Sequence, residues 1–323
     1  MADIVRLPAQ TMLNRLGRVD PATARGKLRL LRWRGLRALL LRISDPLVAY
    51  SFEGHPLRLP FSHDLPLIRQ QHPQYMTNVT RVAQQVAVKY PNAAGVDIGA
   101  NVGDTIIAIR KAASMPLLGI EGNAAFYELL KANVTGLHDV ELDQSFVGYG
   151  VATLSGTLRA EHGTASFISS ASPGQVIVPR PLIEILRAHP RFLNARFLKI
   201  DTDGLDCAIL KAALDWLAGA RPVIYFEYDP SAYARYDPSG FEIFAGLCRA
   251  GYSTALIWDN RGDYLLACDL SDRRLLEDVH QYFAGRQSKV YCDIAVFHDD
   301  DRDVMDASRL AEIEFFSRAR RAP

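Results

Sequence analysis

The chain has 323 residues, of which 49% are hydrophobic and 23% charged, and its formal net charge is +1. This length suffices for one α/β domain of ordinary size with an extension, and a core of that size needs no disulfide bonds. No apolar run approaches the roughly 18 residues of a membrane span, and no signal-peptide pattern opens the sequence. Four cysteines, Cys207, Cys248, Cys268 and Cys292, form no Cys-x-x-Cys pair. Reduced thiols, a soluble protein and a cytoplasmic location are therefore expected.

The charge is unevenly distributed. Residues 1–45 hold ten Lys or Arg and three Asp, so they carry +7 and the remainder carries −6. A nucleic-acid enzyme would normally place basic residues around its pocket. This distribution argues against a nucleic-acid substrate.

A basic amphipathic helix is predicted at residues 28–43 (LRLLRWRGLRALLLRI), where leucines and arginines fall on different sides of a helix. Such a helix could dock on the catalytic domain or on a second subunit, which would make a homodimer. It could also contact an anionic membrane surface, where a lipid-linked substrate would lie. The sequence does not decide between these interpretations.

The next stretch, 49–60, predicts a hairpin turned at Glu53-Gly54. Residues 61–75 are polar and rich in proline, which is typical of a loop over or beside a pocket. Residues 75–89 then predict a helix that leads into the first strand of the domain.

The most informative stretch is Ala94-Gly-Val-Asp-Ile-Gly-Ala-Asn-Val-Gly-Asp-Thr105, which predicts a strand, a tight turn and a helix. Small or conformationally tolerant residues at Gly99, Asn101 and Gly103 allow a ligand to touch the backbone. The free N–H groups at the start of the helix point to the same place. We expect a polar small molecule to lie across this turn.

The spacing of the turn differs from the dinucleotide fingerprint Gly-x-Gly-x-x-Gly, because Gly99-x-Asn101-x-Gly103 follows an acid, Asp97. A carboxylate at this position suits a cationic ligand better than a pyrophosphate. The turn resembles that of Rossmann-like methyltransferases that use S-adenosylmethionine (SAM). The resemblance implies that the cofactor contacts Asp97, Gly99, Ala100, Asn101, Gly103, Asp104 and Thr105.

A second strand at 116–120 ends at Glu121-Gly122-Asn123, before a predicted helix at 124–133. An acid about 20 residues after the glycines is where a ribose diol is bound, in NAD enzymes as in SAM enzymes. A third strand at 140–147 would bring Ser145 and Phe146 near the adenine. We expect all five of these residues, Glu121 to Asn123 with Ser145 and Phe146, to bind the cofactor.

Histidines offer weaker candidates. A segment punctuated by glycines is expected to include a hairpin arm at 153–159 and a substrate-side loop at 162–166. His162 is the histidine to test first, although a solvated loop histidine is the better explanation. His55, His63 and His72 match no acid or nucleophile in spacing. Surface or packing roles are expected for these three.

Two further predicted strands end in residues that carry carboxylates. Residues 197–206 (FLKIDTDGLD) end in Asp201 and Asp203 before a helix at 208–217, and residues 222–230 (PVIYFEYDP) carry Glu227 and Asp229. Because ligands bind beyond the carboxyl ends of the strands of an open α/β sheet, these four carboxylates should share one rim with the turn.

These motifs together are similar to the FkbM family of SAM-dependent methyltransferases, through 96–105, 120–123, 198–206 and the Glu227 strand, and the resemblance covers roughly residues 50–298. It implies a Rossmann-like class I fold, with a mostly parallel seven-stranded sheet and an antiparallel strand near one edge. The family pattern Lys-x-Asp-x-Glu-Gly-x-Glu has two glutamates where this chain has Asp203 and Asp206. A carboxylate one methylene shorter reaches about 1.5 Å less, which alters the geometry of acceptor binding.

The closing third predicts a helix at 240–250, paired strands at 252–258 and 263–268, a helix near 273–283 and a last strand at 290–298. The expected organisation is an N-terminal extension of a basic helix and a hairpin, a SAM-binding catalytic domain, and a C-terminal tail helix. These parts are 1–75, 76–298 and 299–323.

The resemblance implies methyl transfer to a hydroxyl of a sugar, a glycan or a secondary metabolite, and a hydroxyl needs a general base. Asp203 is the preferred base, with Asp201 or Glu227 orienting the acceptor or meeting the ammonium of the cofactor. An aspartate before Gly204 could instead cap the next helix, and the three carboxylates could hold Mg²⁺. An NAD-dependent oxidoreductase and a non-catalytic SAM-fold scaffold are the alternative functions.

Overall fold

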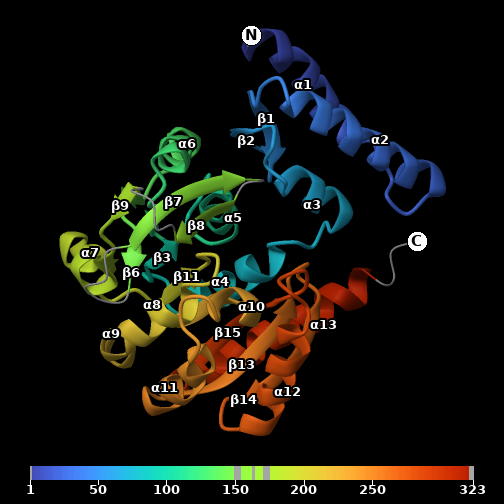
Figure 1. Ribbon diagram of the computed structural model, residues 1–323. Helices are drawn as coiled ribbons and strands as arrows, with labels where there is room; N and C mark the ends of the chain where they lie inside the picture. The colour runs from blue at the N-terminus through green and yellow to red at the C-terminus, as the bar shows by residue number, and fades with distance from the viewer. Residues whose placement is uncertain (1, 149–153, 162–163, 170–174, 320–323) are drawn as a thin grey trace.

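A computed structural model describes residues 2–148, 154–161, 164–169 and 175–319 of the chain. Its centre is an eight-stranded sheet with helices on both faces (Figure 1). From one edge to the other the strands are β14 (Tyr264–Asp269), β13 (Tyr252–Asp259), β15 (Cys292–His298), β12 (Val223–Tyr228), β11 (Phe197–Ile200), β3 (Gly95–Ile98), β4 (Leu117–Ile120) and β5 (Val140–Asp143).

The sheet is mixed. β12, β11, β3, β4 and β5 pair in parallel, whereas β15 lies antiparallel between β12 and β13. The predicted α/β class, a mostly parallel sheet with an antiparallel strand near one edge, is confirmed. The predicted number of seven strands is wrong, because the chain turns back after β13 and adds β14 as an edge strand, with the Gly262 N–H donating to the Asp259 carbonyl over 2.9 Å.

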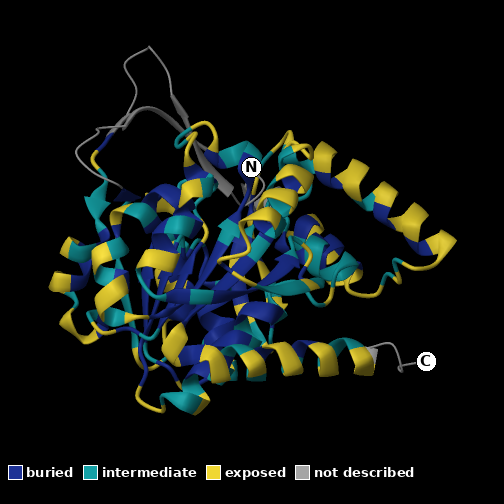
Figure 2. Ribbon diagram, turned by 90° about the horizontal axis from the view of Figure 1, so that it is seen from below, coloured by how far each residue is buried: buried dark blue, intermediate teal, exposed yellow. Residues whose placement is uncertain are grey.

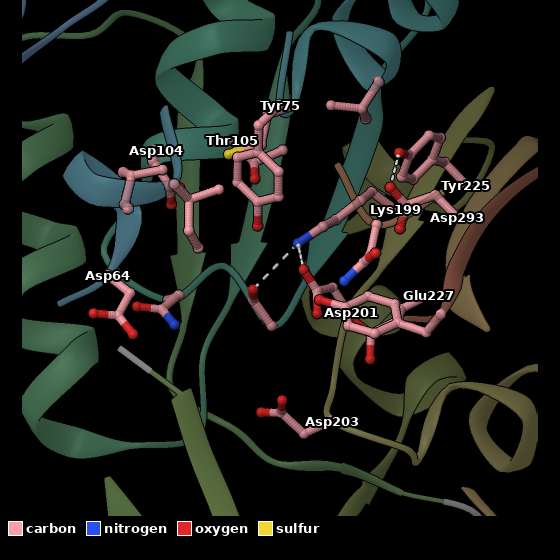
Figure 3. Close-up of a pocket in the computed structure, with 18 of the residues that line it drawn as sticks. Asp64, Tyr75, Asp104, Thr105, Lys199, Asp201, Asp203, Tyr225, Glu227 and Asp293 are labelled. Carbon is pink, nitrogen blue, oxygen red and sulfur yellow. Dashed lines mark hydrogen bonds and ion pairs between the residues drawn. The ribbon is translucent and has the colours of Figure 1, made fainter. Parts of the chain in front are cut away.

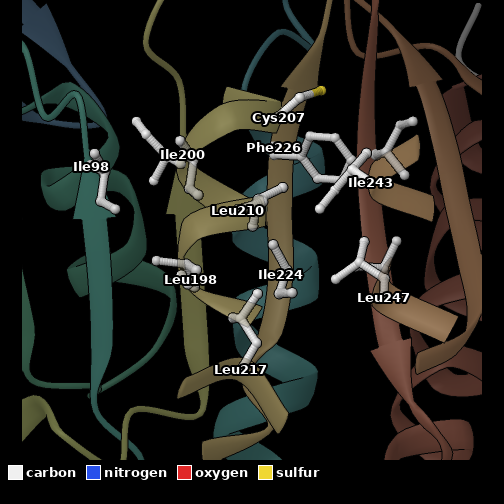
Figure 4. Close-up of a cluster of buried hydrophobic side chains, with 14 of the residues drawn as sticks. Ile98, Leu198, Ile200, Cys207, Leu210, Leu217, Ile224, Phe226, Ile243 and Leu247 are labelled. Carbon is white, nitrogen blue, oxygen red and sulfur yellow. The ribbon is translucent and has the colours of Figure 1, made fainter. Parts of the chain in front are cut away.

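Successive residues of a strand point to opposite faces of the sheet, and because helices cover both faces, these strands are apolar on both sides. On β12, Ile224 and Phe226 pack on one face while Val223 and Tyr225 pack on the other. Figure 4 shows part of the first core. The helices that contribute to it are α7 (Leu182–Ala188), α8 (Asp206–Ala212), α9 (Leu214–Ala220), α10 (Pro230–Tyr233), α11 (Ile243–Arg249) and α12 (Arg273–Ala284).

The opposite face carries the second core. Its helices are α4 (Thr77–Lys89), α5 (Asp104–Ala112), α6 (Ala124–Val134) and α13 (Arg302–Ala319). Figure 2 shows the sheet as the buried centre of the molecule, with exposed residues on the outer sides of the helices. None of the helices in the described part of the chain combines the length and the hydrophobicity that a membrane crossing requires.

The N-terminal extension forms α1 (Ala2–Leu16), α2 (Ala24–Leu41), the hairpin β1 (Leu47–Phe52) and β2 (His55–Pro60), and α3 (Leu65–Gln71). In Figure 1, α1 and α2 lie side by side at the periphery of the molecule. The predicted hairpin is confirmed. The loop predicted at 61–75 is wrong in part, because Pro66 stands in the first turn of α3, where its missing N–H costs no hydrogen bond.

A buried asparagine joins the extension to the sheet. The Asn133 amide donates to the carbonyls of Arg58 and Val102 over 2.8 Å each, and its oxygen accepts the Arg58 N–H over 2.8 Å. The Nε2 of His55 lies 2.9 Å from the Asn133 carbonyl. The hairpin is therefore fixed against the turn that follows β3.

Besides the hairpin of β1 and β2, five further strands in the described part of the chain stand apart from the main sheet. β6 (Val147–Gly148) pairs in parallel with β10 (Arg180–Pro181). β7 (Leu154–Glu161) pairs with β8 (Thr164–Ser169) and β9 (Gln175–Ile177), so the predicted hairpin arm is present. His162 lies outside the described residues.

Candidate active site

The turn after β3 lies directly against the backbone at the end of β11. Gly99, Asn101 and Gly103 adopt positive φ angles of 76°, 48° and 90°, which glycine and asparagine tolerate better than other residues. A Cβ on Gly99 would lie 1.9 Å from the Asp201 carbonyl oxygen. Only glycine therefore allows the turn to lie against the end of β11.

Asp97 lies beneath this turn in a buried ion pair. In the parallel register Asp97 on β3 stands beside Lys199 on β11, and the Lys199 Nζ lies 3.1 Å from Asp97 Oδ1. Lys199 Nζ also lies 3.4 Å from Asp201 Oδ2 and from the Gly99 carbonyl. Burial would lower the pKa of Lys199, but Asp97 and Asp201 raise it above its usual value, so Lys199 is charged. Burial raises the pKa of Asp97 to about 6, although Lys199 opposes the rise.

Glu121 is held by the backbone at the end of β4. Its Oε2 accepts the Asn101 N–H over 2.9 Å, and its Oε1 accepts the Asn123 N–H over 2.7 Å. Burial raises the pKa of Glu121, and the two N–H groups lower it. Each carboxylate oxygen accepts a single N–H here and has a lone pair left for another donor.

An aromatic ring lies on glycine next to this acid. A Cβ on Gly122 would lie 2.3 Å from the Phe146 ring, so the ring can rest on the backbone only because position 122 is glycine. Ser145 is buried, and its Oγ accepts a hydrogen bond from Arg180 over 2.9 Å. These residues form one wall of a cavity of about 820 Å³, open to solvent, which we call the Glu121 cavity.

A second cavity of about 1000 Å³, also open to solvent, lies beside the first, and we call it the acidic cavity (Figure 3). Its lining includes one lysine, Lys199, and six carboxylates: Asp64, Asp104, Asp201, Asp203, Glu227 and Asp293. Thr105 also lines it. Gly99, Asn101, Asp201 and Asp203 line both cavities, so these four residues form the boundary between them.

Asp203 stands apart from the lysine. In Figure 3 it lies away from the group of Lys199, Asp201 and Glu227. Burial and the neighbouring Asp201 and Asp206 raise the pKa of Asp203 to about 8. Its backbone has a positive φ of 54°, which aspartate tolerates better than most residues. Asp203 therefore combines exposure to both cavities with a pKa close to neutrality.

Asp206 has a different place from Asp203. It is buried at the start of α8, and its Oδ2 accepts the Thr202 hydroxyl over 3.0 Å and the Gly204 N–H over 3.3 Å. Burial and Asp201 raise its pKa to about 7. Asp206 lines neither cavity and holds the shape of the 201–206 turn.

Two carboxylates face each other across the antiparallel pair of β12 and β15. Glu227 stands opposite Asp293 in the register, and the Tyr225 hydroxyl donates to Asp293 Oδ2 over 2.7 Å. Burial and Asp201 raise the pKa of Glu227 well above its usual value. Burial raises the pKa of Asp293 to about 7. Glu227 therefore holds its proton more strongly than an ordinary glutamate, and in its protonated form it can donate a hydrogen bond.

The N-terminal extension supplies part of the acidic cavity. His63, Leu65, Ile68, Tyr75 and Met76 line it, together with Asp64. The Nδ1 of His63 accepts the Leu65 N–H over 3.2 Å. Burial lowers the pKa of His63 to about 4, although a hydrogen bond with Asn101 raises it. His63 is therefore neutral at physiological pH and lines the cavity, and the surface or packing role predicted for it stays a prediction.

Several residues that were predicted to bind the cofactor line neither cavity. Ala100 is buried and donates its N–H to the Ile120 carbonyl over 3.1 Å. Gly103 is the N-cap residue that precedes α5, and a Cβ there would lie 2.9 Å from Leu130. Asn123 caps α6 by accepting the N–H groups of Ala125 and Phe126. Asp97 also lines neither cavity. These four residues support the turn and the helices around it.

The sequence prediction missed Lys199, Asp293 and the tyrosines of the acidic cavity, Tyr75, Tyr225 and Tyr291. Lys199 offered a signal, because a lone lysine inside the apolar run FLKI needs a buried partner. Asp293 offered no such signal, since its role depends on the pairing of β15 with β12.

Within the described residues, no group of three or more His, Cys, Asp or Glu side chains is arranged to hold a metal ion. This holds for Asp201, Asp203 and Glu227, which the sequence had offered as ligands of Mg²⁺.

Residues 97–254 match the family model of the methyltransferase FkbM domain. The matched segment contains the turn, Glu121, Asp201, Asp203 and Glu227. The chain therefore carries a methyltransferase FkbM domain over this segment. No curated protein matches its sequence.

Solved structures give distant likenesses. The chain is 16% identical to an FkbM methyltransferase from Methylobacillus flagellatus KT, with 51% of this chain and 40% of that chain covered at a TM-score of 0.37. It is 12% identical to an O-methyltransferase from Bacillus cereus in complex with SAH, with 68% and 80% covered at a TM-score of 0.37. For precorrin-6y C5,15-methyltransferase from Geobacter metallireducens GS-15 the identity is 11%, with 64% and 80% covered at a TM-score of 0.34. The chain thus spans less than half of the length of the M. flagellatus protein.

Proposed function

We propose that this chain is a SAM-dependent O-methyltransferase that methylates a hydroxyl of a sugar, a glycan or a secondary metabolite. The observation that carries the proposal is the pair of adjoining cavities, which share a boundary at Gly99, Asn101, Asp201 and Asp203. One cavity has the residues for a nucleoside and the other has polar residues for an acceptor. The boundary is where a methyl group would pass from one to the other.

The Glu121 cavity fits SAM. Glu121 has free lone pairs for a ribose diol, and Phe146 offers an apolar ring with Ser145 beside it for the adenine. Asp201, which lines both cavities, suits the ammonium of the methionyl part. When bound, SAM supplies an electrophilic methyl group.

Asp203 is proposed as the general base. A hydroxyl attacks efficiently only when a base removes its proton, and a base works best when its pKa lies near the working pH. The pKa of Asp203, about 8, meets this condition better than an ordinary aspartate would. Its place on the boundary between the cavities gives it access to an acceptor hydroxyl.

Glu227 is proposed to orient the acceptor. As a protonated acid it can donate a hydrogen bond to an oxygen of the acceptor, and Asp104 and Thr105 add further polar contacts on the opposite wall. A lining of carboxylates, tyrosines and a threonine suits a molecule with several hydroxyl groups. The acceptor class therefore remains a polyhydroxylated small molecule or glycan.

The test is calorimetry with SAM and with NAD, followed by transfer of a labelled methyl group to a panel of sugars, glycans and hydroxylated metabolites. Binding of SAM without binding of NAD, and label recovered as a methyl ether, would support the proposal. Binding of NAD with turnover of an alcohol would replace it with an oxidoreductase. Binding of SAM without transfer to any acceptor in the panel would favour a scaffold.

A further inference from the structure

The helix α2 has two faces of different character. Its inner face is packed: Leu30 and Arg37 are buried, and the Trp33 indole N–H donates to the Met12 carbonyl over 3.2 Å. Its outer face carries Leu28, Leu31, Leu36 and Leu39, which are between 48% and 66% exposed. Leu28 and Leu39 are eleven residues apart, about three helical turns, so they lie on one side.

This exposure is concentrated. Thirteen large hydrophobic side chains are exposed in the part of the chain whose burial is described, and five of them are Leu28, Leu31, Leu36, Leu39 and the adjacent Ile43. Isolated exposed leucines are ordinary, but a cluster on one helix indicates an interaction surface.

The outer face is also strongly basic. Arg25 and Arg32 lie within about 60° of the line of Leu28 and Leu39, and no acidic residue occurs between Asp20 and Asp45. Arg25, Lys27, Arg29, Arg32, Arg34 and Arg42 are all exposed. Apolar and cationic side chains are therefore interleaved without compensating acids.

We propose that the outer face of α2, defined by Leu28, Leu31, Leu36, Leu39 and the exposed basic residues between them, docks on an anionic lipid bilayer. Leucines would enter the boundary of the acyl chains while the arginines remain at the phosphate groups. Each basic residue near an anionic surface adds to the attraction. This occupant matches both the apolar and the cationic character of the face.

A second copy of the chain fits the same face less well. In a two-fold dimer the same patch lies on both subunits, so α2 would oppose α2. Residues 1–45 carry +7 in each copy, and the patch holds no acid to pair with them. Such a contact would bring like charges together, whereas anionic lipids neutralise them.

Arg37 connects the helix α2, whose outer face would dock, to a residue of the acidic cavity. On the inner side of α2, its guanidinium donates to the Phe61 carbonyl over 3.0 Å, to the Ser62 carbonyl and to Asp64 Oδ1 over 2.6 Å. Asp64 lines the acidic cavity. A bilayer bound to α2 would therefore stand in a fixed relation to the opening of this cavity.

The experiment is cosedimentation of the full chain with vesicles of phosphatidylcholine, either alone or with about 30 mol% phosphatidylglycerol. Two variants test the face: Leu31→Gln/Leu36→Gln/Leu39→Gln and Arg25→Gln/Arg29→Gln/Arg32→Gln. The matched control is Leu310→Gln/Ile313→Gln on α13, whose side chains are also exposed, at 58% and 41%. Thermal unfolding midpoints of all variants show whether each is folded.

We expect binding to the anionic vesicles, at least tenfold weaker binding of both α2 variants with unchanged unfolding midpoints, and wild-type binding of the control. Absence of binding to anionic vesicles, or equal binding of the wild type and the α2 variants, would overturn the proposal. So would a dimer in solution that the leucine variant dissociates while vesicles bind neither form.

Discussion

At Asp203 the backbone conformation and the charges of the neighbouring residues together favour an aspartate with a raised pKa. A positive φ excludes most side chains but suits aspartate and asparagine. The neighbouring acids Asp201 and Asp206 and its own burial hold its pKa near 8. An asparagine at this position would keep both shape and backbone conformation and would lose the ability to accept a proton.

We therefore predict that Asp203→Asn lowers kcat by a factor of about 10² to 10⁴ while leaving SAM affinity nearly intact. In the wild type, kcat/KM should rise as the pH increases through about 8, because the base must lose its proton. The variant should lack this rise. Steady-state kinetics across pH and calorimetry with SAM measure both quantities, and wild-type turnover in the variant would exclude Asp203 as the base.

A second prediction concerns Gly99. Gly99→Ala should weaken SAM binding at least tenfold and lower the unfolding midpoint, because alanine at a positive φ costs roughly 1–2 kcal/mol before its clash with the Asp201 carbonyl is relieved. Gly219→Ala on α9 is the control, since a Cβ there meets nothing within 4 Å. It should be neutral or stabilising by about 0.5–1 kcal/mol. Equal behaviour of the two variants would argue against the close approach of β3 and β11.

At the scale of residues, the sequence predicts what depends on neighbours along the chain. Gly99, Glu121 and Asp203 follow strands and precede helices, so their place at the rim could be inferred. The partner of Lys199 could not, because Asp97 lies about 100 positions away and meets it only through the parallel register. The same holds for Glu227 and Asp293, which approach each other across the β12–β15 pair.

At the scale of elements, the attachment of α13 depends on a buried ion pair. Arg81 on α4 donates to both oxygens of Glu312 on α13, over 2.6 and 2.7 Å, and Glu312 is fully buried. The Arg81 guanidinium also lies 4.0 Å from the centre of the Phe315 ring. This pair fixes the last helix to the second core.

Glu312→Gln should therefore lower the free energy of unfolding by about 3–5 kcal/mol, because it leaves the Arg81 charge poorly compensated in a buried place. Glu314→Gln is the control. Glu314 and its partner Arg318 are largely exposed, and exposed pairs contribute about 0–1 kcal/mol. Denaturant titration of both variants measures the difference, and similar losses would contradict a special role for the buried pair.

Most elements of the sheet could be predicted, since their apolar runs end at glycines or acids. The exceptions have physical reasons. The helix α3 follows a stretch of prolines and polar residues, and it exists because Pro66 starts it while Leu65, Pro66 and Leu67 are buried against the extension. The helix α1 contains Pro8, which hides its pattern, yet Leu13 and Leu16 are buried in the same cluster.

At the scale of the whole molecule, the acids of the site affect stability. Folding raises the pKa values of Asp97, Asp206, Asp293 and Asp203 to between about 6 and about 8. The folded state therefore binds more protons than the unfolded state between about pH 4 and pH 8, and stability is lost as the pH rises through this range. The histidines with lowered pKa values, such as His63, act in the opposite direction, but only below about pH 6.5.

We predict that the unfolding midpoint falls as the pH rises from about 6.5 to about 8.5, a window above the ordinary pKa of histidine, where the lowered pKa of His63 has little effect. Asp203→Asn should reduce this fall, because it removes the group with the highest of the four values. Thermal unfolding in a series of buffers measures the slope. A midpoint that rises over this window would show that the acids do not hold extra protons in the folded protein.

The wall of the acidic cavity built by His63, Leu65, Ile68, Tyr75 and Met76 precedes residue 97, where the match to the methyltransferase domain begins. The acidic cavity, which we propose binds the acceptor, is thus lined both by this preceding segment and by residues of the matched domain such as Asp104 and Glu227. If the proposed function holds, substitutions within residues 61–76 would change the acceptor preference while the turn at Gly99 and the acid Glu121 stay unchanged. Swapping segment 61–76 between relatives offers a direct route to altered selectivity.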